Sequence, residues 1–402
     1  MRILIVSPVI PYPQSSGFTT RVYQLLRLLG LNHEVSLLAY ATPGDVEHIA
    51  ALKTICTAVH TVARAARTTG KTRWTQLSAM VSPVSYQRRS QYTDAMRQKL
   101  ADLCAREPYD VIQVETSQLA SFDFDRRSVL VVTEHDIVYE LLYRMYQTES
   151  SIVRRAYNWM EFVKFKRDEI GTWRSAGAVV TTSARERHIV QELAPGTPVL
   201  VAPNAVDVDY FQPSSEPTDA NAIVMTGFMK TRPNIDAALY FVEKVFPHIL
   251  AARPQMVFYL VGGGAPDEIK RLAGPHVIVT DTVPDVRPYV RKSAVFVVPL
   301  RMGGGTRLKV LEALSMKKPL VSTSLGCEGI DVTHREHLLI ADEPVAFADA
   351  VLELLDNSAL AARLANHGHE LVTHQYQWKA VAAAVEAFYG ELLQARSGRA
   401  PS

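Results

Sequence analysis

Short apolar runs alternate with longer amphipathic segments along the whole chain. The first run, Ile3–Ser7, is typical of a buried strand, and Thr19–Leu29 places its leucines at helical spacing. Strands that alternate with helices indicate parallel sheets with right-handed crossovers. The same pattern predicts strands over Val35–Ala39, Asp110–Val114, Val129–Thr133, Ala178–Thr182, Val199–Ala202, Ile223–Thr226, Val257–Val261, Val295–Pro299 and Pro319–Ser322, and helices over residues 150–174, 184–193, 234–251 and 307–316.

The strand and helix pattern restarts after a short polar stretch near the middle of the chain. A length of 402 residues allows two or three domains at roughly 150 residues each, and the order of the elements favours two. We therefore expect an α/β protein of two doubly wound, Rossmann-like domains that face a cleft, where ligands of such folds bind. The predicted parts are residues 1–211, a linker over 212–220, residues 221–375, a helix over 376–395 that packs back on the first domain, and a tail over 396–402.

Composition and charge narrow the function classes. Apolar residues make up 48% and charged residues 21%, which is ordinary for a soluble globular protein and excludes disorder as the main state. The net charge of +2 argues against a uniformly basic nucleic-acid protein. The two halves differ, because residues 1–200 hold 24 Lys/Arg against 19 Asp/Glu and the remainder 19 against 22. The basic first half is the one we expect to meet an acidic acceptor or an anionic membrane surface.

The cysteines and the N-terminus indicate a cytoplasmic protein. Cys56, Cys104 and Cys327 are too far apart in sequence for a Cys-x-x-Cys metal site, and their odd number disfavours a disulfide framework. Pro8 ends the first apolar run after five residues, so we expect no signal peptide. No window approaches the roughly 18 apolar residues of a membrane span. Membrane contact is therefore expected only as peripheral binding at the inner face of the cell membrane.

The loop after Val295–Pro299 carries the clearest chemistry. Three glycines lead into a predicted helix with Thr306 as its N-cap, and exposed N–H groups at a helix start bind anions. Arg307 and Lys309 fall in the first turn of this predicted helix, where cations oppose the helix dipole unless a polyanion lies beside them. Glu312 lies on the same helix face as Lys309. Alternatively, the loop is a tight turn, with solvated cations and Glu312 paired to Lys309. The loop residues concerned are Gly303, Gly304, Gly305, Thr306, Arg307, Lys309 and Glu312.

Two common nucleotide motifs are absent from the sequence. Gly-x-Gly-x-x-Gly fails in this loop, where the third position is Leu308, and again after Gly262, where it is Asp267. There is also no Gly-x4-Gly-Lys-Ser/Thr. An NAD enzyme of the usual fingerprint and a P-loop ATPase are therefore disfavoured.

The segment GGGTRLKVLEALSMKKPLVSTSLGCEG resembles the donor-binding segment of the retaining GT-B glycosyltransferases of family 4. The resemblance runs the length of the chain, through MRILIVSPVIPYPQSSG, VVTEHD, GAVVTTSARERHIV, VAPNAVDVDYF and VMTGFMKTRPNIDAALYFVEKVFP, in the family's order. It implies transfer of a sugar from a UDP- or GDP-linked donor with retention of anomeric configuration. It also implies that no metal or other cofactor is needed, because basic side chains and helix N-termini stabilise the leaving diphosphate.

The family pattern assigns roles to individual residues. In its Glu-x7-Glu spacing Glu312 matches the ribose-binding second glutamate, while the first falls on Gly304, where backbone N–H groups of the loop can replace it. The family's Arg and Lys that grip the diphosphate are displaced here, with Phe228 where Arg is common. Lys230 and Arg232 are candidates by proximity, and Arg307 and Lys309 take over part of the task.

Further candidates lie in the first half of the chain. His135, in VVTEHD, matches the family histidine that reaches the donor sugar, whereas a lone histidine is otherwise an ordinary surface or core residue. Gly17, read as opening a helix at Thr19, allows close backbone approach to phosphate or sugar, or is an ordinary loop glycine. The Asp-x-Asp of Asp207 and Asp209 lies inside a family motif and is interpreted as structural.

Two stretches combine cations with aromatic residues. Residues 60–100 hold eight Lys/Arg and one acid, and residues 154–167 are also basic and aromatic. Such stretches bind anionic headgroups or an acidic acceptor, or they are solvated helix faces over buried aromatics.

The leading hypothesis is a glycosyltransferase of hexosyl type that builds a surface polysaccharide or glycoconjugate on a glycan or lipid-linked acceptor. The alternatives are an epimerase or hydrolase acting on a nucleotide sugar with the same fold, and a non-catalytic nucleotide-sugar-binding protein. A donor-only incubation separates the epimerase from the transferase.

Overall fold

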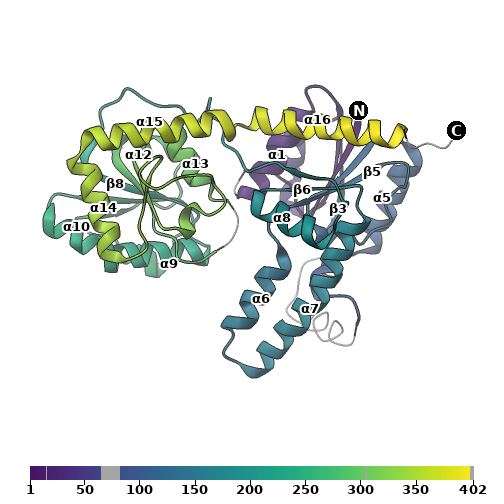
Figure 1. Cartoon of the computed structure of the whole chain (residues 1–402), viewed down its shortest axis with the longest axis horizontal. Coiled ribbons are helices and arrows are strands. Elements are labelled where there is room, and N and C mark those ends of the chain that lie inside the picture. The colour runs from purple at the N-terminus through teal and green to yellow at the C-terminus, as the bar shows by residue number, and fades with distance from the viewer. Residues whose placement is uncertain (15, 65–81, 304–305, 399–402) are drawn as a thin grey trace. The chain divides into compact units, whose positions relative to one another are not determined.

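The computed structural model describes residues 1–14, 16–64, 82–303 and 306–398. These form two compact units, Met1–Pro203 with Val381–Ser402 and Asn204–Ala380. Each unit is a parallel sheet flanked by helices (Figure 1). The predicted α/β class and the doubly wound character of both units are therefore confirmed.

The N-terminal unit has a seven-stranded sheet in the order β3-β2-β1-β4-β5-β6-β7. Every pairing in it is parallel, and β1 lies between β2 and β4. All residues of β1 after Arg2 are buried, as expected where helices cover both faces of a sheet. The strands are β1 (Arg2–Ser7), β2 (Glu34–Ala41), β3 (Ala58–Ala63), β4 (Val111–Val114), β5 (Val129–Glu134), β6 (Ala178–Thr181) and β7 (Val199–Val201).

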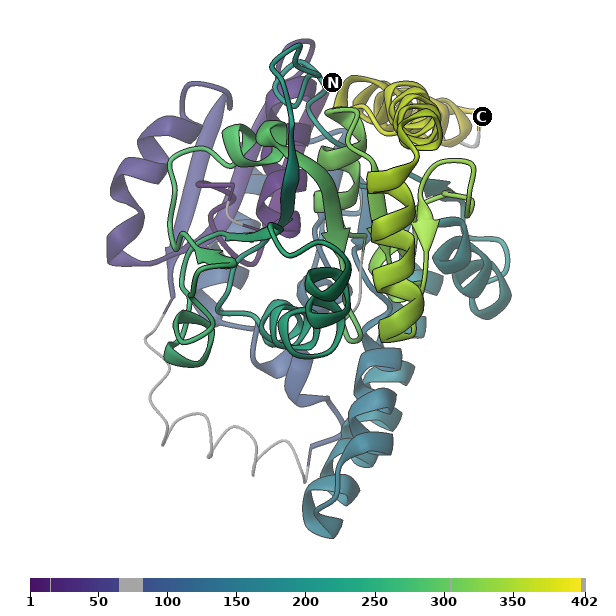
Figure 2. The same ribbon diagram turned by 90° about the vertical axis from the view of Figure 1, so that its left-hand side faces the viewer.

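The helices of this unit connect successive strands, and two of them form a hairpin that extends away from the sheet, as both views show (Figures 1 and 2). The hairpin consists of α6 (Val138–Thr148) and α7 (Ile152–Ser175). The other described helices that connect these strands are α1 (Gly17–Leu29), α2 (Val46–Leu52), α4 (Tyr86–Arg89), α5 (Asp94–Arg106) and α8 (Ala184–Leu193), with 3-10 turns at Pro43–Asp45 and Ser117–Leu119.

The C-terminal unit has a six-stranded sheet in the order β10-β9-β8-β11-β12-β13. Its pairings are also all parallel. Its core is one continuous apolar cluster in which Phe241, Phe246 and Phe258 pack together. The strands are β8 (Asp219–Thr226), β9 (Val257–Val261), β10 (Val277–Val279), β11 (Ser293–Val298), β12 (Leu320–Ser322) and β13 (Leu339–Ile340).

The helix predicted over 234–251 forms with an irregular middle turn. It consists of α9 (Arg232–Tyr240), a π-helical turn over Phe241–Val245 and α10 (Phe246–Ala252). Pro247 lies at the start of α10 and lacks an N–H group, so a regular ladder cannot pass through it. The remaining helices are α11 (Asp267–Lys270), α12 (Arg287–Lys292), α13 (Leu308–Ser315), α14 (Pro344–Asp356), α15 (Ser358–Gln375) and α16 (Trp378–Ser397), with a 3-10 turn at Leu325–Cys327.

The units meet in sequence at Pro203 and Asn204, ahead of the linker predicted over 212–220. The segment after Asn204 is tied to the C-terminal unit, because Val206 bridges to Gln377 and Ser315 donates to the Phe211 carbonyl over 2.6 Å. Strand β8 also begins inside the predicted linker, at Asp219. From Val381 onward the last helix, α16, belongs to the N-terminal unit.

Strand order places one reversal point in each sheet. The chain leaves β1 toward β2 on one side and later adds β4 on the other, and β8 and β11 repeat this arrangement. Ligands of open parallel sheets bind outside the carboxyl ends of the strands at such a point. The residues to inspect are therefore those that follow β1, β4 and β5, and those that follow β8, β9 and β11.

Among the helices of the described ranges, none is both long and apolar enough to cross a membrane.

Candidate functional site

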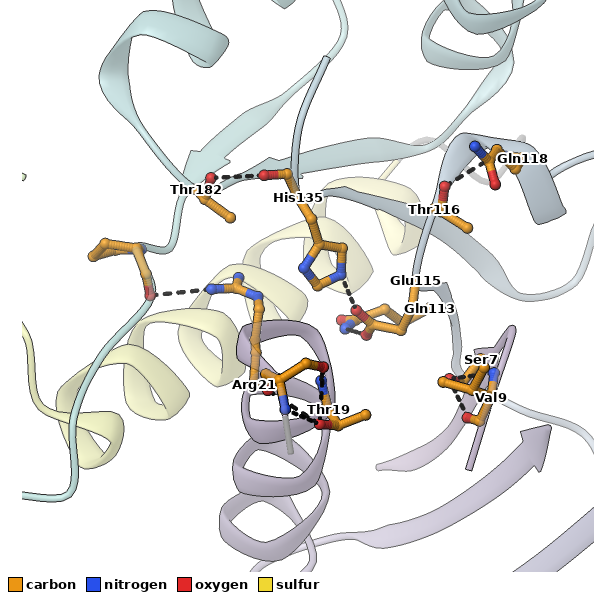
Figure 3. A network of polar contacts seen from close by, with 12 residues as sticks. Ser7, Val9, Thr19, Arg21, Gln113, Glu115, Thr116, Gln118, His135 and Thr182 are labelled. Carbon is orange, nitrogen blue, oxygen red and sulfur yellow. Dashed lines mark hydrogen bonds and ion pairs between the residues drawn. The ribbon is translucent and has the colours of Figure 1, made fainter. Parts of the chain in front are cut away.

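His135 follows β5 directly, and Figure 3 shows Glu115 at its ring and Thr182 at its carbonyl oxygen. Its Nε2 lies 3.0 Å from Oε2 of Glu115, the residue after β4. The Phe18 ring of α1 packs against the imidazole, with 4.6 Å between the ring centroids. The Thr182 hydroxyl donates to the His135 carbonyl over 3.3 Å. The predicted candidate thus lies one strand from the sheet's reversal point and contacts residues that follow β4 and β1, and 15% of its side chain is exposed.

Glu115 is fully buried and fixes which ring nitrogen of His135 is available. A carboxylate only accepts hydrogen bonds, so the tautomer with a proton on Nε2 donates to Glu115 and leaves Nδ1 as an acceptor. The second oxygen of Glu115 accepts from the Gln113 amide, and Gln113 in turn accepts from the hydroxyl of Tyr389 in α16. A buried relay therefore runs from the last helix to His135.

Arg21 of α1 supplies the positive charge of this region (Figure 3). It is fully buried, and its Nη1 donates to the Pro203 carbonyl over 3.0 Å. Burial lowers the pKa of Arg21, while the charges of Glu115 and Glu186 act in the opposite direction. The buried carboxylates of Glu115 and Glu186 therefore balance part of the charge of the buried Arg21 guanidinium.

The start of α1 differs from the prediction. The helix begins at Gly17, two residues before Thr19. Ser16 caps it, because its hydroxyl accepts from the Thr19 N–H over 3.2 Å while the Thr19 hydroxyl accepts from the Ser16 N–H over 2.9 Å. This reciprocal pair satisfies two N–H groups and extends the helix backward. Gly17 is thus the first helical residue, next to Phe18, which contacts His135.

The glycine loop after β11 also differs from the prediction in one respect. Helix α13 begins at Leu308, its N-cap is Arg307, and no side chain caps it, so Thr306 is not the cap. Instead, the Thr306 hydroxyl lies beside Gly329, and a Cβ added to that glycine would be 3.5 Å from it. Arg307 therefore precedes the helix and Lys309 lies in its first turn. Gly304 and Gly305 lie outside the described residues.

Lys309 reaches across to the strand end of β8. Its Nζ donates to Oδ1 of Asn234 in α9 over 2.8 Å, and the Asn234 amide donates to the Phe228 carbonyl over 3.0 Å. A Cβ on Gly227 would lie 2.8 Å from the same Nζ. Burial lowers the pKa of Lys309 to about 8, with the Glu312 charge acting against this and the Arg307 charge adding to it. An anion beside this amine would raise its pKa again.

Three glycines, Gly227, Gly262 and Gly264, form a backbone surface beside Lys309, here called the glycine floor. A Cβ on Gly262, after β9, would lie 1.9 Å from the Gly227 carbonyl oxygen, so the loops that follow β9 and β8 touch through their backbones. Gly264 would meet the Lys230 side chain at 2.7 Å, which places Lys230 over this floor. Gly262 and Gly264 have φ of 142° and 80°, conformations that side chains disfavour. The result is a closely packed backbone surface against which the side chains of Lys309 and Lys230 lie.

Arg307 lies over Gly303. A Cβ at Gly303 would be 3.0 Å from Nη2 of Arg307 and 3.4 Å from Pro233 in the first turn of α9. Gly303 has a φ of 117°, which favours glycine. Arg232, the first residue of α9, is exposed. Of the cations predicted from sequence, Lys230 and Lys309 border the glycine floor, and Arg307, over Gly303, is near enough for its charge to lower the pKa of Lys309.

Glu312 lies one turn after Lys309 in α13 and is half-buried. Burial raises the pKa of Glu312 to about 7, and the Lys309 charge acts against this. The carboxyl group therefore titrates near neutrality. Its pairing with Lys309 is electrostatic, since the hydrogen bond of the Lys309 amine goes to Asn234.

The Asp-x-Asp pair, Asp207 and Asp209, lies in the segment before β8. Asp207 Oδ1 accepts from the Tyr210 N–H over 3.1 Å, and Asp209 pairs with Lys379 at 3.0 Å. Both carboxylates therefore serve local structure. Within the described ranges, no three His, Cys, Asp or Glu side chains are grouped closely enough to hold a metal ion.

Sequence reasoning missed several residues of both groups. Glu115 carried a signal, because a charged residue directly follows the apolar strand Val111–Val114 at the sheet's reversal point. Asn234, Gln113, Arg21 and Tyr389 carried none, since only the folded chain brings them to their partners.

Two family models match the chain. The model described as Glycosyltransferase Family 4 matches residues 15–210, and the one described as Glycosyl transferases group 1 matches residues 220–357. A Klebsiella pneumoniae protein described as an uncharacterized 44.6 kDa protein in the cps region is 22% identical, over 96% of this chain and 98% of its own.

Solved structures share the fold. Sucrose-phosphate synthase from Thermosynechococcus elongatus superposes with a TM-score of 0.70 at 18% identity, covering 98% of this chain and 100% of its own. Anabaena HepE in complex with UDP-glucose gives a TM-score of 0.66 at 13% identity, covering 97% and 100%. At these identities the likeness defines the fold, which is that of the GT-B proteins.

Proposed function

We propose that this chain, whose two parts match the family 4 and the group 1 glycosyltransferase models, transfers a sugar from a nucleoside diphosphate sugar to a glycan or lipid-linked acceptor. The relative from a cps region supports a role in surface polysaccharide or glycoconjugate synthesis. HepE with bound UDP-glucose supports a nucleotide-sugar donor, UDP- or GDP-linked.

The observation that carries the proposal is the glycine floor with its cations at the reversal point of the C-terminal sheet. We assign the diphosphate to Lys309, Arg307 and Lys230, with the N–H groups of Gly303 and of the start of α13 as further donors. Positive groups fixed in place stabilise the charge that builds up on the leaving diphosphate. The remaining predicted donor-binding residues are Gly17, Arg232, Gly304, Gly305 and Thr306.

Glu312 is assigned to the ribose of the donor. A carboxylate accepts hydrogen bonds from both hydroxyls of a ribose, and Glu312 lies on the same helix as the diphosphate-binding Lys309. Binding would favour its ionised form over the neutral form that burial promotes.

His135 is assigned to positioning and polarising the transferred sugar. Glu115 holds its Nε2, so Nδ1 is the nitrogen that can accept a hydrogen bond from a sugar hydroxyl. We further propose that transfer retains the anomeric configuration, with the leaving phosphate oxygen taking the acceptor proton, and that it requires no metal. Full activity in the presence of EDTA is the expected result, and activity restored only by added divalent metal would contradict metal independence.

The transfer reaction is tested by incubating the full chain with UDP-, GDP- and ADP-linked sugars, with and without a lipid-linked glycan extract. Nucleoside diphosphate release is expected to depend on the extract, and the product should keep the donor's anomeric configuration by NMR. Conversion of the donor alone into another nucleotide sugar or into free sugar would indicate an epimerase or a hydrolase. Binding without turnover of any donor would also contradict the proposal.

A further inference from the structure

The helical hairpin α6–α7 is a rigid projection of the N-terminal unit (Figures 1 and 2). The N-cap residue of α6, Ile137, makes no side-chain capping hydrogen bond. Instead, Glu169 of α7 accepts from the Val138 and Tyr139 N–H groups over 3.1 and 3.0 Å. The carboxylate of Glu161 binds the Tyr86 N–H over 2.8 Å, which fixes α7 to the body of the unit.

Aromatic rings hold the two helices together toward their joined ends. Tyr143 and Phe162 pack with 5.0 Å between ring centroids, and Tyr146 and Trp159 with 5.1 Å. The guanidinium of Arg155 lies 5.0 Å from the centre of the Tyr146 ring. The hairpin is therefore held together by contacts between its own two helices. Other side chains of the hairpin face solvent.

That outer surface is unusually apolar. Of the fifteen large apolar side chains that are exposed among the described residues, seven lie between residues 141 and 163. At the start of α7, Ile152 is 85% and Val153 79% exposed. Ile152, Trp159 and Val163 follow helical spacing and share one face of α7. The others are Leu141, Tyr143 and Met145.

The charge on the hairpin is positive. Residues 138–175 contain seven Lys/Arg and five Asp/Glu, and three of the acids, Glu161, Asp168 and Glu169, are buried. Arg154 and Arg155 directly follow the exposed Ile152 and Val153. Apolar and aromatic side chains surrounded by cations match the interface of an anionic bilayer, where rings and aliphatic groups enter the headgroup region and cations meet lipid phosphates.

We propose that the end of the α6–α7 hairpin docks on an anionic lipid bilayer through Ile152, Val153 and Trp159, with Arg154 and Arg155 on the headgroups. The inference goes beyond sugar transfer, because it requires only the surface of this hairpin. A second copy of the chain would cover the apolar side chains but would bring the same cations together, so charge complementarity favours the lipid.

Vesicle flotation of the full chain tests the proposal without donor or acceptor, so its outcome is independent of the transferase assignment. Binding is expected to vesicles with about one-third phosphatidylglycerol and not to phosphatidylcholine alone, and it should weaken as salt rises to about 0.5 M. The variant Ile152→Glu with Val153→Glu should lose at least about tenfold in binding. Leu31→Glu, at an equally exposed apolar residue of the same unit, should bind like wild type.

Trp159 gives a direct readout of contact with lipid. Brominated lipids in the anionic vesicles should quench fluorescence of the wild type, and Trp159→Phe should lose that quenching. Failure of the wild type to bind anionic vesicles, or unchanged binding of the Ile152→Glu, Val153→Glu variant, would overturn the proposal. So would a dimer in solution that this variant dissociates without any lipid binding, because a second copy would then occupy the face.

Discussion

His135 Nε2 and Glu115 Oε2 lie 3.0 Å apart, and the carboxylate of this pair is completely buried. The two residues follow neighbouring strands, β5 and β4, so the sheet itself sets their separation. A buried acceptor on one ring nitrogen orients the ring and leaves Nδ1 for a ligand. Glu115 is therefore the positioning residue behind the proposed role of His135.

Replacing Glu115 with Gln should reverse the tautomer of His135. Gln113 donates to one oxygen of residue 115, so an amide there would turn its NH2 group toward His135 and require Nε2 to accept. The result should be a fall in kcat of about 100-fold with a small change in KM. Nitrogen-15 NMR of the histidine ring checks the tautomer directly.

The exposed Glu192 of α8 provides the control for that substitution. Glu192→Gln should leave both kcat and the imidazole spectrum unchanged. A Glu115→Gln variant with wild-type kcat would remove the positioning role, whatever its stability.

Tyr389→Phe should destabilise the N-terminal unit. The Tyr389 hydroxyl is the donor to the buried Gln113 amide oxygen, and its removal leaves that oxygen without its donor. An unsatisfied buried group costs about 1–3 kcal/mol of unfolding free energy. Thermal unfolding should show a lower Tm, whereas Tyr92→Phe, at a half-exposed tyrosine, should not; equal Tm values for the two variants would contradict the relay.

Donor affinity should be greatest between about pH 7 and 8. The free Lys309 loses its proton as pH rises through about 8, and an anionic diphosphate binds the protonated form, so affinity falls above that pH. Glu312 gains a proton as pH falls through about 7, and ribose hydroxyls donate best to the ionised form, so affinity falls below it.

The measurement is calorimetric titration with an intact nucleotide sugar, because its phosphates are diesters and lack the terminal ionisation near pH 6 of a phosphate monoester. Lys309→Ala should abolish the alkaline decline, and Glu312→Gln the acidic one. An affinity that is constant from about pH 6 to 9 in the wild type would rule out both assignments.

Gly227→Ala should weaken donor binding with a modest loss of stability. Its Cβ would lie 2.8 Å from Lys309 Nζ and 2.9 Å from Asn234 Nδ2, so both side chains must shift. Gly262→Ala should instead unfold the unit, since its Cβ would overlap the Gly227 carbonyl and its φ of 142° disfavours a side chain. Gly274→Ala, with nothing within 4 Å of its Cβ, is the control. Donor affinity of Gly227→Ala equal to that of Gly274→Ala would contradict this floor.

Much of this organisation was predictable from local pattern. The apolar runs located the strands Ile3–Ser7 and Val129–Thr133, and the sheet order then brought His135, after β5, beside Glu115, after β4. The cations Arg307 and Lys309 were predicted because they follow a strand and a glycine run. These features depend on residues close together in sequence.

The partners of those residues were not predictable. Tyr389 and Gln113 are 276 positions apart, and Lys309 and Asn234 are 75 apart, so only the packed fold joins them. Helix starts were misplaced for a local reason: Ser16 and Thr19 form a reciprocal cap that moves α1 back to Gly17, and α13 starts at Leu308 with no capping side chain.

The central claim is that the glycine floor and its cations bind the diphosphate of a nucleotide sugar. Titration calorimetry of wild type, Lys309→Ala and Glu312→Ala with UDP- and GDP-linked sugars tests it most directly, with Lys244→Ala, at an exposed lysine of the same unit, as control. A lost charge-assisted contact amounts to about 1.5–3 kcal/mol, so Lys309→Ala and Glu312→Ala should each bind roughly 10- to 100-fold more weakly, and Lys244→Ala like wild type. Unchanged affinity in both site variants, with the fold intact, would contradict the claim.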